Sequence, residues 1–247
     1  MGSRSLGVFG VMVEPDGKGG ERLWVGSSDE GLGLYEDGRW RRFSADSGDL
    51  PTSSISMIRP LTDADGNRTL WLGTWGGDLL RIGDGPSFTL QPTPWPKLTG
   101  QSVQHILRRT VEGREELWIG TRLSGAWRLR DGTWDVMRAP GIDGQWRVSQ
   151  FVNQRDRNGR DWLWASTDRG LARFDGKAWT LFDNDHGFPD DQLAGLRLYP
   201  DAQGNPILWM GSVAGNTRGC SGSPMSTRMI PTRALPIHRI GRPFASG

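Results

Sequence analysis

The sequence predicts an all-β protein built from a repeated four-stranded sheet, and three observations support this fold class. A Leu-Trp tetrapeptide recurs five times, with its tryptophans 47, 47, 46 and 45 residues apart. Asp-Gly pairs lie between short apolar stretches, which indicates tight β-hairpins because glycine adopts the positive φ that these turns require. Helical periodicity is absent. A repeat of about 40–50 residues with four short strands is typical of the blades of a β-propeller.

Each copy predicts four strands, A to D, in a fixed order. An apolar stretch and a polar turn give strand A, the tetrapeptide gives strand B, a glycine with a short apolar stretch gives strand C, and the residues after the Asp-Gly turn give strand D. In the second copy these strands are expected at about residues 54–60, 69–74, 79–82 and 87–91. One blade cannot bury both faces of its sheet, but neighbouring blades around a shared axis can.

The recurrent tryptophans are therefore interpreted as core residues packed between blades. These are Trp24, Trp71, Trp118, Trp164 and Trp209. A second set, Trp40, Trp134 and Trp179, is interpreted as structural residues of the outer strand, and Trp127 and Trp162 fall within strands and are expected in the core.

Residues 1–213 are predicted to form one domain of four complete blades and half of a fifth, an incomplete arc of a larger ring. The blades are expected at about 7–48, 49–95, 96–141, 142–186 and, as a partial copy, 187–213. Exposed strand edges of such an arc would favour association between copies. Residues 214–247 contain the single cysteine, Cys220, with five arginines and no acidic residue, and are expected to be a disordered or out-of-frame basic tail.

The composition excludes several classes of partner. The formal net charge is +2, and no basic cluster precedes residue 218, so nucleic acid is not an expected partner. No apolar run approaches the length of about 18 residues that a membrane span needs, and the first 20 residues lack the pattern of a signal peptide. One cysteine permits no intrachain disulfide.

The ordered motifs resemble the two-component regulator propeller repeat from residue 7 to about residue 213. The resemblance rests on Gly73-Thr74, Gly120-Thr121, Gly170-Leu171-Ala172-Arg173 and Gly187-Phe188-Pro189, with Gly48-Asp49-Leu50-Pro51 as a looser version. It implies a seven-bladed ring in the periplasm, the input domain of a hybrid sensor kinase or diguanylate cyclase. The implied partners are a small or oligosaccharide ligand, and the missing blades, an adjacent propeller and the output domain of the same protein.

Strand alternation places the B–C loops and the D–A connections on one rim. Aromatic residues there that break the repeat, and charged residues of the B–C loops, are candidates for ligand binding. The candidates are Trp75, Trp95, Trp146, Arg122, Asp168 and Arg169, with Asp29 and Glu30 in the same class of loop. Aromatic faces beside charged groups suit a sugar ring or another polar ligand. The alternative is that these side chains fill the loops or contact a partner domain.

No catalytic constellation is recognised, so we expect a binding module without a cofactor or metal. The three histidines, His105, His186 and His238, are far apart in sequence and lack the spacing of metal ligands. Residues 63–67 are faintly similar to a calcium loop but lack its ligand spacing, and are interpreted as an A–B turn. Two alternatives stay open: a propeller enzyme, such as a lyase or glycoside hydrolase, whose carboxylates come from separate loops, and a protein-interaction scaffold.

Overall fold

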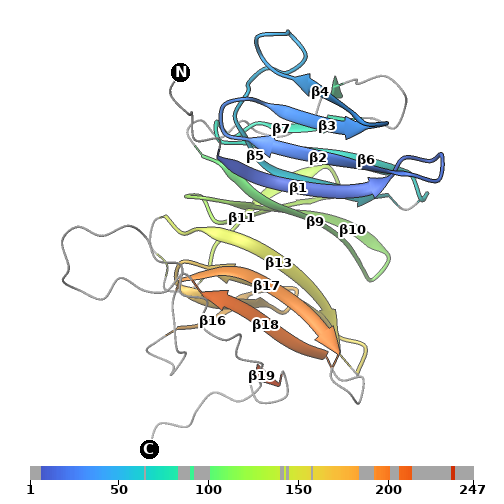
Figure 1. Cartoon of the computed structure of the whole chain (residues 1–247). Helices are drawn as coiled ribbons and strands as arrows, with labels where there is room; N and C mark the ends of the chain where they lie inside the picture. Colours follow the sequence, from blue (N-terminus) through green and yellow to red (C-terminus); the bar gives the residue numbers. More distant parts are fainter. Residues whose placement is uncertain are drawn as a thin grey trace, which may run out of the picture. The chain divides into compact units, whose positions relative to one another are not determined.

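The structure is a computed structural model, in which every regular element assigned among the described residues is a β-strand (Figure 1). The described residues are 7–63, 65–82, 90–91, 101–139, 142, 145–156, 158–183, 192–200, 206–212 and 235–236. The strands form four sheets of four strands and one sheet of three, each in sequence order. This confirms the all-β propeller fold of four-stranded blades.

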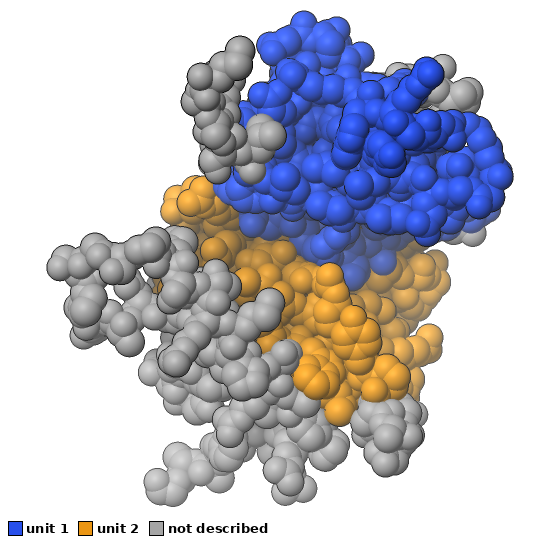
Figure 2. Space-filling view, in the orientation of Figure 1, with its two compact units in different colours: residues 1–108 blue, residues 109–247 orange. Residues whose placement is uncertain are grey.

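The chain divides into two compact units, residues 1–108 and 109–247 (Figure 2). Unit 1 contains blades one and two. Blade one consists of β1 (Val8–Pro15), β2 (Glu21–Ser27), β3 (Leu32–Glu36) and β4 (Arg39–Phe43). Blade two consists of β5 (Ile55–Thr62), β6 (Arg68–Thr74), β7 (Leu79–Ile82) and β8 (Leu90–Gln91), close to the strand ranges expected for this copy.

Blade three begins at the division between the units, which falls within β9. Its strands are β9 (Val103–Val111), β10 (Arg114–Thr121), β11 (Ala126–Arg130) and β12 (Thr133–Met137). Blade four consists of β13 (Val148–Arg155), β14 (Asp161–Thr167), β15 (Gly170–Phe174) and β16 (Trp179–Phe182). Blade five has β17 (Leu193–Pro200) and β18 (Pro206–Ser212), and β18 also pairs with β19 (Leu235–Pro236). The rest of the predicted tail lies outside the described residues.

The predicted A–B and C–D hairpin turns form, at the end of the blades opposite the B–C loops. Asp37-Gly38 and Asp131-Gly132 connect strands C and D, and all four residues have positive φ, as a two-residue type I′ turn requires. The turn at Asp63 connects strands A and B as expected: its carboxylate accepts hydrogen bonds from the backbone N–H of Asp65 and Asn67. This local pattern is an Asx-turn, which favours reversal of the chain.

The buried tryptophans of the tetrapeptides confirm the core prediction in blades one to four. Trp24, Trp71, Trp118 and Trp164 are all buried, whereas Trp209 in blade five is half-buried. Three of them also satisfy their indole N–H: Trp24 donates to Glu14, Trp118 to Glu116 and Trp164 to Gln154, at 2.8, 2.8 and 2.7 Å. In blade two the position matching Glu14 is Leu61, and the Trp71 indole has no acceptor among the described residues.

The glycine of the tetrapeptide permits close approach of the next blade. A Cβ on Gly26 would lie 2.8 Å from Ile55 Cγ2, and one on Gly73 would lie 2.8 Å from Val103 Cβ. Within unit 2, a Cβ on Gly120 would lie 2.6 Å from the carbonyl oxygen of Val148. In blades one to three, Trp-x-Gly therefore forms a flat face on which the following strand A packs, because an added Cβ at the glycine would meet the next blade. In blade four the small side chain of Ser166 occupies this position.

Candidate functional site

Backbone hydrogen bonds hold the B–C loops against the segments that precede strand A in unit 1. The N–H of Trp75, in the B–C loop of blade two, donates to the carbonyl of Ser54 at 3.0 Å. The N–H of Gly31, in the B–C loop of blade one, donates to the neighbouring carbonyl of Ser53 at 2.8 Å. The D–A segment thus links two consecutive B–C loops, as expected for loops on one rim.

Unit 2 repeats this arrangement around Trp146 and Arg147. The N–H of Trp146 donates to the carbonyl of Leu123 at 3.2 Å, which ties the segment to the B–C loop of blade three. The N–H of Arg147 donates to Asp168 Oδ1 at 2.8 Å, and the N–H of Asp168 donates back to the Arg147 carbonyl at 3.4 Å. Asp168 therefore lies where the sequence places it, but one of its oxygens is already occupied by the backbone.

A serine or threonine hydroxyl stabilises the B–C loops of blades one to four. This residue directly follows the strand B glycine, which is replaced by a serine in blade four. Thr121 donates to the carbonyl of Gly125 at 3.0 Å and accepts from the N–H of Ser124 at 3.0 Å. Thr167 donates to the carbonyl of Gly170 at 2.8 Å, and Ser27 and Thr74 make comparable loop contacts. Sequence reasoning used this residue only as part of a family motif. Its recurrence after strand B is the signal that would have predicted a rigid loop.

Two of the predicted residues, Arg122 and Arg169, are exposed on the loops that the Trp146–Arg147 segment joins. Each lies next to a residue fixed by a backbone hydrogen bond: Leu123 in one loop and Asp168 in the other. A guanidinium offers five N–H donors in a planar fork, which suits hydroxyl-rich or carboxylate-bearing ligands. We call this pair, exposed on two loops that one segment links by hydrogen bonds, the arginine rim.

Trp146 is not part of that surface, because its side chain is only 3% exposed. Its indole lies edge-on to Trp179, with ring centroids 6.1 Å apart, and directly over Gly125. A Cβ on Gly125 would lie within 1.7 Å of the Trp146 Nε1 atom, so this glycine makes the space that the indole fills. A ligand cannot stack on Trp146 without displacing it from the core.

The other predicted residues have different surroundings. Trp75 is half-buried, and Phe9 packs against it edge-on with ring centroids 4.9 Å apart. Glu30 forms an ion pair with Arg42 at 2.7 Å. Trp95 lies outside the described residues, so its role stays a prediction.

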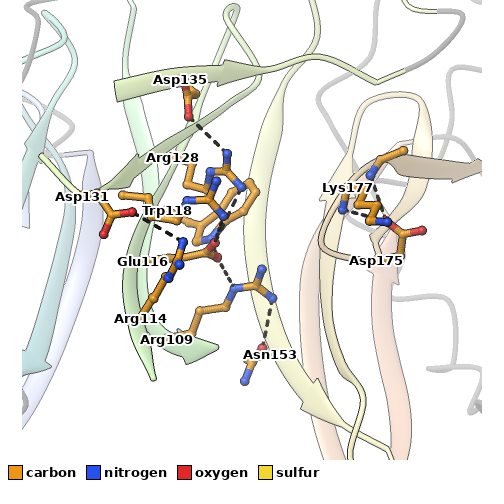
Figure 3. A network of polar contacts seen from close by, with 12 residues as sticks. Arg109, Arg114, Glu116, Trp118, Arg128, Asp131, Asp135, Asn153, Asp175 and Lys177 are labelled. Atoms are coloured by element: carbon orange, nitrogen blue, oxygen red, sulfur yellow. Dashed lines mark hydrogen bonds and ion pairs between the residues drawn. The ribbon is translucent and has the colours of Figure 1, made fainter. Parts of the chain in front are cut away.

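A buried ionic cluster lies in blade three, away from the predicted site residues. Glu116 accepts from Arg109 Nε at 2.8 Å and from the Trp118 indole at 2.8 Å, and Arg128 Nη1 lies 3.6 Å from its other oxygen (Figure 3). Arg109 also reaches the side chain of Asn153 in blade four at 3.5 Å. Burial lowers the pKa of Arg109, and the charge of Glu116 opposes this shift. All partners belong to the chain, which makes the cluster part of the scaffold.

The described residues contain no group of three or more His, Cys, Asp or Glu that could hold a metal ion. His105 is buried in β9, and the other two histidines lie outside the described part of the chain. In that part, no helix is long and apolar enough to cross a membrane.

The fold is similar to that of solved structures, while no family model and no curated protein matches the sequence. The extracellular domain of a protein described as a one-component system, BT4673 from B. thetaiotaomicron, has a TM-score of 0.58 and 19% identity over 83% of this chain. BBS1N, solved in complex with ARL6DN, has a TM-score of 0.52 and 10% identity over 83% of the chain. The chain spans 26% and 63% of these two structures. A thermostable family-43 glycoside hydrolase has a TM-score of 0.47 and 10% identity, with 85% of each chain covered, too low to bear on function.

Proposed function

We propose that this chain is a ligand-sensing propeller domain located outside the cytoplasm, the input part of a two-component or diguanylate cyclase signalling protein. The ordered repeat motifs support this class, and so does the similarity of the fold to an extracellular domain of a one-component system. The proposed ligand is a small polar molecule or oligosaccharide, and the proposed partners are further blades and the output domain of the same protein.

The observation that carries the proposal is the arginine rim on loops of fixed geometry. Hydrogen bonds from Thr121 and Thr167 hold the two loops, and the Trp146–Arg147 segment connects them. A rim that is ordered before binding loses less conformational entropy when a ligand binds. The charges of Arg122 and Arg169 would supply directed hydrogen bonds, which give specificity in a polar site.

Titration of the full chain with neutral and acidic oligosaccharides, followed by calorimetry, tests this proposal. Arg122→Ala and Arg169→Ala are each expected to weaken binding by about tenfold or more, the effect of losing a charged hydrogen bond. Arg155→Ala is the matched control, because Arg155 is exposed at the opposite end of β13. Binding that is insensitive to both rim variants, or equally sensitive to the control, would show that the ligand site lies elsewhere.

Trp75→Ala tests the second, separate part of the predicted rim in unit 1. Trp75 packs against Phe9, so the variant also requires a thermal unfolding measurement. Loss of affinity with unchanged unfolding temperature supports a stacking role, and unchanged affinity removes Trp75 from the site.

A further inference from the structure

One face of blade one exposes a contiguous apolar surface. Six of the eight exposed large apolar side chains among the described residues belong to β1–β4. On one face of this sheet lie Val11, Val13, Leu23, Val25, Tyr35 and Trp40, which are connected by cross-strand pairing. We call these six residues the leading face. Val11 is 59% exposed and Trp40 is 60% exposed, and an apolar patch of this kind marks an interaction surface.

The same face is covered in the blades that follow another blade. Leu23 and Val25 correspond in the repeat to Leu70 and Leu72 of blade two, which are 7% and 0% exposed. In unit 1 these leucines share one core cluster with Trp24, the tryptophan of the preceding blade. In unit 2, Leu208 of blade five likewise packs in a cluster with Trp164 of blade four. A leading face is therefore built to receive the Trp-x-Gly face of another blade.

Blade five carries an uncovered Trp-x-Gly face among the described residues. Trp209 is half-buried, and Tyr199 and Arg197, on the paired strand, are exposed. A Cβ added at Gly211 would have one neighbouring atom within 4 Å among the described residues, the backbone nitrogen of Gly195 at 4.0 Å. A Cβ added at the equivalent glycine of blades one to three would clash with the next blade. We call Arg197, Tyr199, Trp209 and Gly211 the trailing face.

The charges at these two faces are complementary. Within unit 1 the first residue of strand B in blade two, Arg68, forms an ion pair at 3.1 Å with Glu14 of blade one. Within unit 2 the first residue of β14, Asp161, attracts Arg109 of blade three. In blade one the same position is Glu21, which is exposed. In blade five the position that matches Glu14 is Tyr199, and the cation Arg197 lies two residues before it on the same face of the strand. Opposite charges at the edges of an apolar interface favour one orientation of the partner.

We propose that the leading face of blade one binds the trailing face of blade five in a second copy of this chain. The contact repeats the packing that already joins blades one and two and blades four and five. It is heterologous, because the two copies use different surfaces, so assembly continues head to tail unless a ring closes.

The test is the concentration dependence of the mass of the full chain, measured by sedimentation velocity. The wild-type chain is expected to form dimers and larger species as its concentration rises. Val11→Lys on the leading face and Gly211→Leu on the trailing face should each weaken self-association by about tenfold or more. Val136→Lys is the control, because Val136 is an exposed valine on β12, outside both faces. Circular dichroism would verify that each variant folds.

Mixing the two variants gives the decisive result. The Val11→Lys chain retains its trailing face and the Gly211→Leu chain retains its leading face, so an equimolar mixture should restore dimers but no longer species. A wild-type chain that is monomeric at every concentration would overturn the proposal. Association that both variants leave intact, or a mixture that stays monomeric, would overturn it as well.

Discussion

Replacing Glu116 by glutamine should destabilise unit 2, because it removes the carboxylate that pairs with buried Arg109 at 2.8 Å. It also removes one of the two carboxylates near buried Arg128, which keeps its ion pair with Asp135 at 3.1 Å. The side chains of Arg109, Glu116 and Arg128 are 2%, 5% and 9% exposed. Gln154 in blade four shows that an amide can accept the tryptophan N–H in this repeat, so Glu116→Gln can keep the bond to Trp118. The variant therefore tests mainly the ion pairs. Removing one partner of a buried pair costs about 3–5 kcal/mol.

The matched control is Glu14→Gln in blade one. Glu14 accepts from the Trp24 indole as Glu116 does from Trp118, but its arginines, Arg22 and Arg68, have side chains 27% and 38% exposed. Water can solvate these guanidinium groups when the carboxylate is lost, so the expected cost is only about 1 kcal/mol. The difference between the two variants isolates the effect of burial.

Urea unfolding followed by tryptophan fluorescence measures both costs. With a slope of about 2 kcal/mol per M, a loss of about 3 kcal/mol lowers the midpoint by about 1.5 M for Glu116→Gln. Replacing Glu116, Arg109 and Arg128 together by apolar residues of similar volume should recover most of this loss, because no charge is then left buried. Equal midpoints for Glu116→Gln and Glu14→Gln would refute the reasoning.

Three further predictions concern blade packing, the rim and acid stability. Gly120→Ala should destabilise unit 2 by about 1–3 kcal/mol in urea unfolding, because the new Cβ meets the backbone of Val148, and an unchanged midpoint would contradict this packing. Thr121→Val should cost about 1–2 kcal/mol and speed amide exchange in the B–C loop, whereas unaltered exchange would show that the hydroxyl does not fix the loop. Hydrogen bonds from the Trp162 indole and from backbone N–H groups lower the pKa of Asp156, so stability should fall as the pH drops through about 4 and below, and Asp156→Asn should reduce that dependence.

Much of the fold follows from local signals that the sequence carries in every copy. Two-residue Asp-Gly turns require positive φ at both positions, and Asp37-Gly38 and Asp131-Gly132 adopt it, whereas in the longer turn of blade four only Gly176 does. The tetrapeptide tryptophans of blades one to four are buried, and in blades one to three the glycine two residues later removes the side chain that would block the next blade. These features depend on neighbours in sequence and on a repeated interface, so one pattern predicts them all.

The environment of single side chains could not be predicted in the same way, even at equivalent positions of the repeat. Trp40 was expected in a structural role on the outer strand, and it does lie on β4, but its side chain is 60% exposed beside Tyr35. The sequence pattern of strand D is the same in blade four, where Trp179 is buried against Trp118. Only the presence of a packed neighbour distinguishes the two, and that is a property of tertiary structure.

An aromatic residue that breaks a repeat is therefore weak evidence for a ligand site in this fold. Trp146 breaks the repeat pattern at the rim, yet its indole fills the space that Gly125 leaves open in the neighbouring B–C loop. The extra aromatic ring is therefore accommodated by a missing side chain next to it. Arg122 and Arg169 are exposed on the B–C loops, and long cationic side chains are not drawn into a core in this way, because burying them costs hydration energy. On a repeat scaffold, charged residues at rigid loop tips are thus better candidates for ligand contact than aromatic ones, and the rim variants described above should show this difference directly.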